Sequence, residues 1–523
     1  MNASIDAVPP DYNFAADILK RNLDAGRGDK AAYIDHRGSI TYAALAARVE
    51  RFGHVLRALD IRPEERILIC LLDTIDWPTA FLGAIKAGVV AVPVNTLLTE
   101  DDYRFMLDDS RARLLVVSEE LLPKFAKAIE TSKNLAHVVV SGGDAKGHQR
   151  FADLMMQAAK TDAFTAPTKR DDMCFWLYTS GSTGKPKGAV HTHADLKLTD
   201  DLYAGPILGI TAKDVCYSVA KLFFAYGLGN ALTFPMSAGA TAVLLPARPT
   251  PEAVAEILKK HDVTVFYAVP TFYAGFLASP AAPDRGEVKM RCCVSAGEAL
   301  PPDVGRRWSE RYSLDILDGI GSTEMLHIFL TNRPGDVKYG TSGKRLAGYD
   351  LRLVDDDGAI VTKPGEMGEL QVRGPTSAMM YWNSREQSRS TFLGEWTRSG
   401  DKYVEDEDGY FTYCGRRDDM LKVSGMYVSP FEVEGVLQSH PDVLEAAVVG
   451  WPDSDRLIKP KAFVVLKSPA GADEALARTL QDHCKQKLAA YKYPRWLEFR
   501  TELPKTATGK IQRFKLRAEA EGK

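Results

Sequence analysis

Several features that mark specialised classes of protein are scarce in this sequence. The formal net charge is only -3 and Lys and Arg are scattered, so no nucleic-acid or anionic-membrane partner is expected. The seven cysteines are odd in number and lack the CxxC or Cys/His spacing of zinc sites. We expect all seven to be buried in a protein of a reducing cytoplasm, with a catalytic cysteine as the alternative. These absences favour small-molecule chemistry.

Export and membrane insertion also have little support. The first twenty residues lack a basic leader followed by an apolar core, so no export is expected. Two uncharged runs, Leu222 to Ala247 and Val263 to Pro283, are long enough to span a bilayer. Glycines and prolines interrupt both, for example at Gly227, Pro235 and Pro270, so we predict buried segments of a globular protein.

The length and the pattern of apolar runs indicate the fold. A chain of 523 residues exceeds what one compact core usually supports, so a large domain and a smaller one are expected. Short β-rich runs such as Arg66 to Leu72 and Ala112 to Val117 alternate with helical stretches such as Asp76 to Ala87. This alternation predicts an α/β fold with largely parallel sheets.

A change of character follows about Tyr349, where short strands separated by Asp-Gly and Pro-Gly turns predict a β-rich subdomain. A charged cluster at residues 416–419 then precedes a final stretch with strands and a helix of its own. We predict a large domain over residues 1–417 and a small α+β domain over residues 418–523.

The strongest local signal is TSGSTGKPKG, at residues 179–188, directly after an apolar strand-like run. Its glycines, hydroxyls and lysines make a flexible loop that offers backbone N–H groups and positive charge to phosphate oxygens. A Walker A loop is excluded, because Thr179 replaces its first glycine and Pro186 follows Lys185 where Ser or Thr must hold magnesium. The alternative is a solvated Gly/Ser turn.

Three further blocks carry candidate chemistry. In DGIGSTE, at residues 318–324, a hydroxyl and a carboxylate stand side by side, as a site for magnesium-bound phosphate requires, although such a pair also caps helices. Ser399-Gly400-Asp401 offers an ionised acceptor for hydroxyl groups. PKTATGKIQR, at residues 504–513, carries Lys510 on a Gly-bearing loop, where a charged ammonium could stabilise a transition state or belong to a basic tail.

Together, and in this order, these blocks resemble the acyl-adenylate-forming superfamily, which includes acyl-CoA synthetases, firefly luciferase and the adenylation domains of peptide synthetases. The resemblance spans nearly the whole chain and implies that Thr323 contacts phosphate and that Glu324 holds Mg²⁺. Ile320 departs from the family pattern, because many relatives have a tyrosine there that stacks on adenine. The residues implied to bind ATP or AMP are Thr179, Ser180, Ser182, Thr183, Lys187, Glu298, Asp318, Asp401 and Arg416.

The resemblance also implies how coenzyme A reaches the site. Asp418, in GRRDDMLKVSG, matches the hinge about which the C-terminal domain of the family rotates, and Lys510 matches the catalytic lysine. The segment around Gly425 resembles the part of acyl-CoA synthetases that lines the pantetheine tunnel. Coenzyme A is therefore the expected acceptor of the acyl group.

The acid pocket is expected where residues 221–229, 295–300 and 319–329 meet, with aromatic walls and small residues that leave space for a ring. AKLFFAYGLGNALTFPM and DGIGSTEMLHIFL are similar to segments of bacterial benzoate–CoA ligases. His327 could be a core histidine or contact the acid directly. Phe224 stands at a position that relatives often fill with a histidine. The resemblance implies that an aromatic side chain at this position gates access from the ring pocket to the tunnel. The resemblance implies a ring site of Phe224, Ala225, Tyr226, Ala296, Gly297, Gly321, His327 and Ile328.

The hypothesis is thus a benzoate–CoA ligase that uses ATP, Mg²⁺ and coenzyme A. Two alternatives stay open: a ligase for 4-hydroxybenzoate or another substituted benzoate, and a non-catalytic acid-binding protein on the same scaffold. A homodimer is compatible with the sequence, which does not determine the oligomeric state. The family also suggests that a lysine acyltransferase could act on Lys510 and remove its charge.

Overall fold

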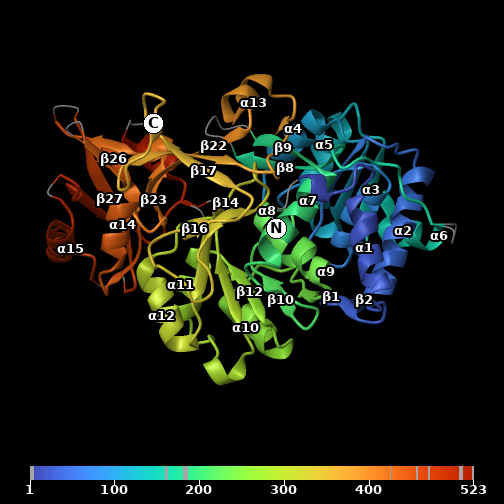
Figure 1. The fold of residues 1–523 in the computed structure, drawn as a ribbon, viewed down its shortest axis with the longest axis horizontal. Helices are drawn as coiled ribbons and strands as arrows, with labels where there is room; N and C mark the ends of the chain where they lie inside the picture. Colours follow the sequence, from blue (N-terminus) through green and yellow to red (C-terminus); the bar gives the residue numbers. More distant parts are fainter. Residues whose placement is uncertain are drawn as a thin grey trace.

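The computed structural model describes residues 5–158, 163–180, 186–423, 426–454, 457–468, 471–489, 491–505 and 511–520. The large region contains three sheets, between which the chain crosses more than once, and a C-terminal α+β part follows them (Figure 1).

The first sheet has the strand order β20-β9-β8-β4-β3-β5-β6-β7, and its central strands run parallel. Its core strands are almost fully buried, as their runs of Val, Ile and Leu predict for a sheet covered on both faces. Helices α2 (Tyr42–Ala58), α3 (Asp76–Lys86) and α4 (Glu100–Ser110) cover it. Its strands are β3 (Arg66–Cys70), β4 (Val90–Pro93), β5 (Leu114–Ser118), β6 (His137–Ser141), β7 (Gln149–Arg150), β8 (Met173–Ser180), β9 (Pro186–Thr192) and β20 (Met380–Tyr381).

The second sheet has the order β16-β15-β14-β13-β12-β10-β11-β1-β2 and packs against α10 (Pro251–Lys260), α11 (Pro270–Ala278) and α12 (Pro302–Tyr312). Near the β16 edge of this sheet, β14 and β15 pair antiparallel. Its strands are β1 (Ala31–Asp35), β2 (Gly38–Thr41), β10 (Val215–Ser218), β11 (Thr241–Val243), β12 (Val265–Ala268), β13 (Cys292–Ser295), β14 (Ile316–Gly321), β15 (Ile328–Thr331) and β16 (Lys344–Arg345).

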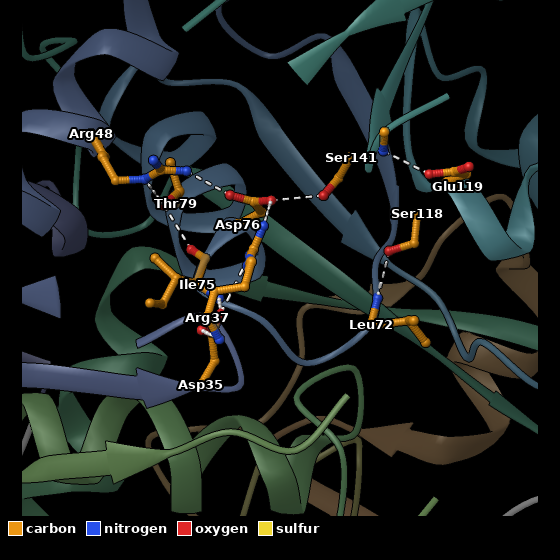
Figure 2. Close-up of polar contacts among 11 residues, drawn as sticks. Asp35, Arg37, Arg48, Leu72, Ile75, Asp76, Thr79, Ser118, Glu119 and Ser141 are labelled. Atoms are coloured by element: carbon orange, nitrogen blue, oxygen red, sulfur yellow. Dashed lines mark hydrogen bonds and ion pairs between the residues drawn. The ribbon is translucent and has the colours of Figure 1, made fainter. Parts of the chain in front are cut away.

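A buried carboxylate joins these two parts. Asp76, at the start of α3, accepts a 2.5 Å bond from Arg48 on α2 and a 2.7 Å bond from Ser141 at the end of β6 (Figure 2). Its second oxygen also accepts from Arg37, in the β1–β2 hairpin, at 3.1 Å. Because that hairpin belongs to the second sheet, the network fixes one layer on the other.

The third part is a sheet of β17 (Asp350–Val354), β18 (Ile360–Val361), β19 (Met367–Arg373), β21 (Phe392–Leu393), β22 (Trp396–Glu405) and β23 (Phe411–Arg416). The hairpin β24 (Leu421–Val423)–β25 (Met426–Val428) follows. The C-terminal part then packs β26 (Val443–Pro452), β27 (Ile458–Leu466) and β28 (Trp496–Phe499) against α14 (Pro430–Gln438), α15 (Glu474–Lys487) and α16 (Arg513–Ala520).

The predicted fold class is confirmed: mainly parallel α/β sheets, a β-rich part and a small α+β C-terminal part. Nothing tests the boundary at residues 417 and 418, which stays a prediction. Within the part of the chain that the structure describes, no helix is both long and apolar enough to cross a membrane. The run 222–247 is divided among α8 (Ala225–Leu228), a π-helical turn (Gly229–Thr233), α9 (Phe234–Ala238) and β11.

One expectation about the cysteines is wrong. Six of the seven are buried, but Cys414 is only partly buried. It lies on β23, which among the described residues pairs only with β22 and has no strand on its other edge.

Candidate active site

The two ends of the predicted phosphate-binding segment lie on paired antiparallel strands. In the pairing of β8 with β9, Thr179 faces Lys187 and Ser180 faces Pro186. Ser182 and Thr183 lie outside the described residues, as does the side chain of Ser180. The Nζ atom of Lys187 lies 4.4 Å from the centre of the Tyr381 ring, a cation–π arrangement that orients its ammonium.

The predicted metal ligand Glu324 lies in a tight turn between β14 and β15. The Tyr381 hydroxyl donates a 2.6 Å hydrogen bond to Glu324 Oε1, and the Ala378 N–H donates to the Glu324 carbonyl at 2.7 Å. The neighbouring Thr323 is half-buried, as is Glu324 itself. The carboxylate is therefore held in place by Tyr381 of β20, the edge strand of the first sheet that pairs with β9.

Charged groups of three segments surround this turn. Burial lowers the pKa of Lys187; the charge of Glu324 opposes this shift and that of Arg416 adds to it. The charge of Asp401 raises the pKa of Arg416 well above its ordinary value, with a smaller contribution from Glu324. Two cations thus lie close to one carboxylate, an arrangement that suits a polyphosphate and its metal.

The donor set fits a magnesium ion delivered with its substrate. No cluster of three or more His, Cys, Asp or Glu side chains among the described residues could hold a metal by itself. Mg²⁺ usually takes one or two protein carboxylates and completes its shell with water and substrate phosphates. Glu324 is suited to such a role beside bound nucleotide.

Asp401 and Arg416, both implied by the family resemblance to bind ATP or AMP, are cross-strand neighbours. Asp401 on β22 pairs in register with Arg416 on β23, and Arg416 Nη1 lies 3.0 Å from Asp401 Oδ1. The same nitrogen donates to the Ser399 carbonyl at 3.2 Å. Gly400 between them has φ +73°, a left-handed conformation that favours glycine. The strand register therefore brings the predicted pair together.

Asp318 lies on β14, the strand next to β13. It is buried, and one carboxyl oxygen accepts from the Leu300 N–H at 3.4 Å, so it supports the loop at residues 296–300. Burial raises its pKa to about 8. Glu298 in that loop is half-buried and accepts a 3.0 Å bond from Thr271. Direct contact of either residue with ATP stays a prediction.

His327, a member of the predicted ring site, is surrounded by aromatic side chains. Its ring centre lies 4.5 Å from that of Phe234, 5.5 Å from that of Tyr203 and 5.7 Å from that of Tyr226. The Tyr226 hydroxyl donates to the Val294 carbonyl at 3.1 Å, which fixes this side chain under β13. Neither ring nitrogen of His327 has a hydrogen-bond partner among the described residues. Burial lowers the pKa of His327 to about 3, against a smaller opposing effect of the Tyr226 backbone, so the ring is neutral near pH 7.

The remaining residues predicted to line the ring site are four apolar side chains and two glycines. Ala296 and Ile328 are buried in the same core cluster, while Phe224 and Ala225 are half-buried at the start of α8. The Phe224 ring lies 4.3 Å from that of Phe223.

Two glycines of the set are explained by their backbone. Gly297 has φ +94° and lies on the surface. At Gly321 a Cβ would meet the backbone carbonyl oxygen of His327 at 2.4 Å, and the contact of this glycine with the ring of the acid stays a prediction. Gly321 is needed because β14 and β15 approach closely at this point.

Three predicted residues fall on segments that are not fully described. Gly425 and Lys510 lie outside the described residues, and so does the side chain of Asp418. The flanks of Lys510 are described: Lys505 and Ile511 form an antiparallel bridge, and the Gln512 N–H donates to the Pro504 carbonyl at 2.8 Å. The assignments of these three residues stay predictions.

Sequence reasoning missed two side chains that the fold brings to the site. Tyr381 contacts Glu324 from a strand far along the chain, and no local pattern signals this contact. His191 contacts the Thr323 carbonyl from the end of β9 at 2.7 Å. The sequence signal that could have pointed to His191 is the carboxylate of Asp195 four residues further along the chain.

The chain matches two family models. Residues 20–382 match the AMP-binding enzyme model, and residues 432–510 match the AMP-binding enzyme C-terminal domain. The chain belongs to the AMP-binding enzyme family. The predicted resemblance to acyl-CoA synthetases of the adenylate-forming superfamily is thereby confirmed.

Relatives of this AMP-binding enzyme include ligases of aromatic acids. It is 61% identical, over 98% of this chain and 97% of the relative, to a benzoate–CoA ligase of Thauera aromatica. It is 48% identical to a 4-hydroxybenzoate–CoA/benzoate–CoA ligase of Rhodopseudomonas palustris, over 97% of this chain and 94% of the relative. A solved benzoate CoA ligase from Burkholderia xenovorans LB400 superposes with a TM-score of 0.91 at 52% identity, covering 97% of this chain and 100% of the other.

Proposed function

We propose that this AMP-binding enzyme is a benzoate–CoA ligase that forms benzoyl-CoA, AMP and pyrophosphate from benzoate, ATP and coenzyme A. The observation that carries the proposal is the 61% identity to a benzoate–CoA ligase along nearly the whole of both chains. The neutral, aromatic surroundings of His327 support it, because they suit a flat ring without a second charge.

In the first half-reaction a benzoate carboxylate oxygen attacks the α-phosphorus of Mg-ATP, and pyrophosphate leaves with its electron pair. Lys187 and Glu324, with its metal ion, would balance the charge of the β- and γ-phosphates. Asp401 and Arg416 would hold the ribose. Lys510 would neutralise the approaching carboxylate and α-phosphate, so the product is benzoyl-AMP.

In the second half-reaction the thiolate sulfur of coenzyme A attacks the carbonyl carbon of benzoyl-AMP, and AMP leaves as the phosphate anion. Rotation of the C-terminal domain about Asp418 would withdraw Lys510 and bring the segment around Gly425 to the pantetheine tunnel. One ring pocket then serves both reactions, and Phe224 stands where it could gate the tunnel.

A specific observation favours a second candidate substrate, 4-hydroxybenzoate. The two ring nitrogens of buried His327 lack hydrogen-bond partners among the described residues, so a hydroxyl on the ring could pair with one of them. The relative at 48% identity carries both acids in its name. Discrimination between small rings by such a contact amounts to about 1–3 kcal/mol, or roughly 10- to 200-fold in kcat/KM.

The test is acid-dependent pyrophosphate release with Mg-ATP and coenzyme A, run with benzoate, 4-hydroxybenzoate, 2-aminobenzoate and a medium-chain fatty acid. The proposal expects the highest kcat/KM for benzoate. A higher value for another aromatic acid would keep the chemistry and overturn the choice of substrate. No release with any acid would support the alternative of a non-catalytic acid-binding protein.

Three further statements belong to this proposal. We place the protein in the cytoplasm, in keeping with seven cysteines that all lack a disulfide partner. A homodimer is tested by light scattering of the purified protein. Acylation of Lys510 by a lysine acyltransferase, which would remove the charge needed for the first half-reaction, is tested by mass spectrometry of the native protein.

A further inference from the structure

His191 was not among the predicted site residues, but it is hydrogen-bonded to the turn that carries Thr323 and Glu324. His191, the next-to-last residue of β9, is fully buried and stacks on Phe175 with ring centres 5.3 Å apart. Its Nε2 lies 2.7 Å from the carbonyl oxygen of Thr323, and its Nδ1 lies 2.8 Å from Asp195 Oδ2. The imidazole therefore bridges β9 and α7 (His193–Thr199) to the turn that carries Thr323 and Glu324.

The chemistry of the partners fixes the direction of the hydrogen bond to the turn. The Thr323 carbonyl oxygen can only accept, so Nε2 of His191 carries a proton and donates it. The same carbonyl accepts a second bond from the Leu326 N–H at 3.2 Å. Leu326 has φ +64°, an uncommon conformation for leucine, so the turn is tight and its carbonyl direction is set by these two donors.

Hydrogen bonds from Thr192 hold the carboxylate of Asp195 in place. Its Oδ1 accepts from the Thr192 hydroxyl at 2.8 Å and its Oδ2 from the Thr192 N–H at 3.1 Å, in the capping box that begins α7. Asp195 is buried. The helix start therefore fixes the carboxylate, the carboxylate fixes the imidazole, and the imidazole fixes the Thr323 carbonyl.

β9 links this chain of contacts to the phosphate-binding loop, because Lys187 lies on the same strand as His191. The hydrogen bond from His191 thus joins β9 directly to the Thr323–Glu324 turn, in addition to the contacts that Tyr381 and Ala378 make with Glu324. We propose that His191, anchored by Asp195, is a positioning residue that fixes the turn of Thr323 and Glu324 against β9 for the binding of Mg-ATP. This inference rests on the nucleotide site of the proposed function, but not on the identity of the acid.

The experiment uses two amides that each reproduce one nitrogen of the imidazole. His191→Gln can place its amide nitrogen near the position of Nε2 and keep the bond to Thr323. His191→Asn places its amide nitrogen near Nδ1, keeps the bond to Asp195 and loses the bond to Thr323. The full-length protein is used, and the readouts are the Kd of Mg-ATP without acid, the KM of Mg-ATP, and thioester formation from supplied benzoyl-AMP.

The proposal expects His191→Asn to raise the Kd and KM of Mg-ATP about tenfold, since a hydrogen bond in a buried network is lost. His191→Gln should stay within about threefold of the unchanged protein, and both variants should keep thioester formation from benzoyl-AMP. Equal effects of the two amides, or equal losses in both half-reactions with a lowered Tm, would overturn it in favour of a packing role.

A second variant covers the case that His191→Asn does not fold. Asp195→Asn keeps the volume but replaces an acceptor of Nδ1, and it should raise the Kd of Mg-ATP by a smaller factor. An unchanged Kd in that variant would overturn the proposal. Because Mg-ATP binding is measured without acid, failure of benzoate as a substrate would overturn the proposed function alone.

Discussion

The hydroxyl of Tyr381 lies 2.6 Å from Oε1 of Glu324, and the ring of the same tyrosine lies 4.4 Å from Nζ of Lys187. One side chain therefore orients both the predicted metal ligand and a predicted phosphate contact. Burial raises the pKa of Tyr381 far above its usual range, with the charge of Glu324 adding to the shift, so the phenol is a donor throughout the working pH range.

Replacing Tyr381 by phenylalanine keeps the ring beside Lys187 and removes the bond to Glu324. A hydrogen bond to a charged group contributes about 1.5–3 kcal/mol, so we expect the Mg²⁺ concentration for half-maximal pyrophosphate release to rise about 10- to 100-fold. Tyr410→Phe removes a tyrosine–carboxylate bond to Asp336, outside the candidate site, and serves as the control. An equal effect of the two variants would contradict the assignment.

His327 should make stability depend on pH. Burial lowers its pKa from 6.5 to about 3, so the unfolded chain binds one more proton than the folded protein between these values. The contribution of this group to stability is therefore complete above pH 6.5 and is lost as the pH falls toward 3, by up to about 1.4 kcal/mol per pH unit.

Thermal unfolding of the protein and of His327→Leu at several values between pH 5 and pH 7.5 checks this sign. Leucine does not titrate, so the variant should lose Tm less steeply than the unchanged protein as the pH falls. Parallel pH profiles of the two proteins would show that His327 is not kept neutral by burial.

A buried ion pair should stabilise the C-terminal part. Glu434 on α14 accepts two bonds from Arg513, at 3.1 and 2.6 Å, and one from the Val448 N–H at 2.7 Å. Glu434→Gln would leave the guanidinium without its countercharge. Breaking a buried pair costs about 3–5 kcal/mol, and we expect about 2–3 because the Arg513 side chain is 22% exposed.

Hydrogen exchange of α14 and β26 measures this loss locally. The control is Glu432→Gln on the same helix, because the Glu432 side chain is 41% exposed in its salt bridge with Lys492 and such an exposed carboxylate contributes below about 1 kcal/mol. If the amides of α14 and β26 were equally protected from hydrogen exchange in both variants, the Glu434–Arg513 pair would not stabilise this part more than a surface salt bridge does.

Lys510 should act in only one half-reaction. Lys510→Ala is expected to reduce benzoate-dependent pyrophosphate release by at least about 100-fold, as loss of a charge that stabilises the transition state does. Thioester formation from supplied benzoyl-AMP should be retained. Lys515→Ala, which removes an exposed lysine of α16, is the matched control. Equal loss of both half-reactions in Lys510→Ala would remove the role assigned to this lysine.

The sequence predicted most of what local pattern determines. Buried parallel strands such as β3 and β5 and the buried helix α3 follow from the length and composition of their apolar runs. The Asp401–Arg416 pair was found because both residues stand in recognisable motifs, and the register of β22 with β23 then brings them together.

Features set by contacts between distant segments could not be predicted in this way. Tyr381 approaches Glu324 only because β20 pairs with β9. The close approach of β14 and β15, which requires glycine at position 321, is not visible in the sequence. The partial exposure of Cys414 likewise depends on which strand edge stays open.

The central claim is that this enzyme activates benzoate as an adenylate before coenzyme A takes part. The most direct measurement is benzoate-dependent exchange of labelled pyrophosphate into ATP, without coenzyme A. The account predicts rapid exchange that requires both benzoate and Mg²⁺. Exchange that needs coenzyme A, or that proceeds equally well without benzoate, would contradict it.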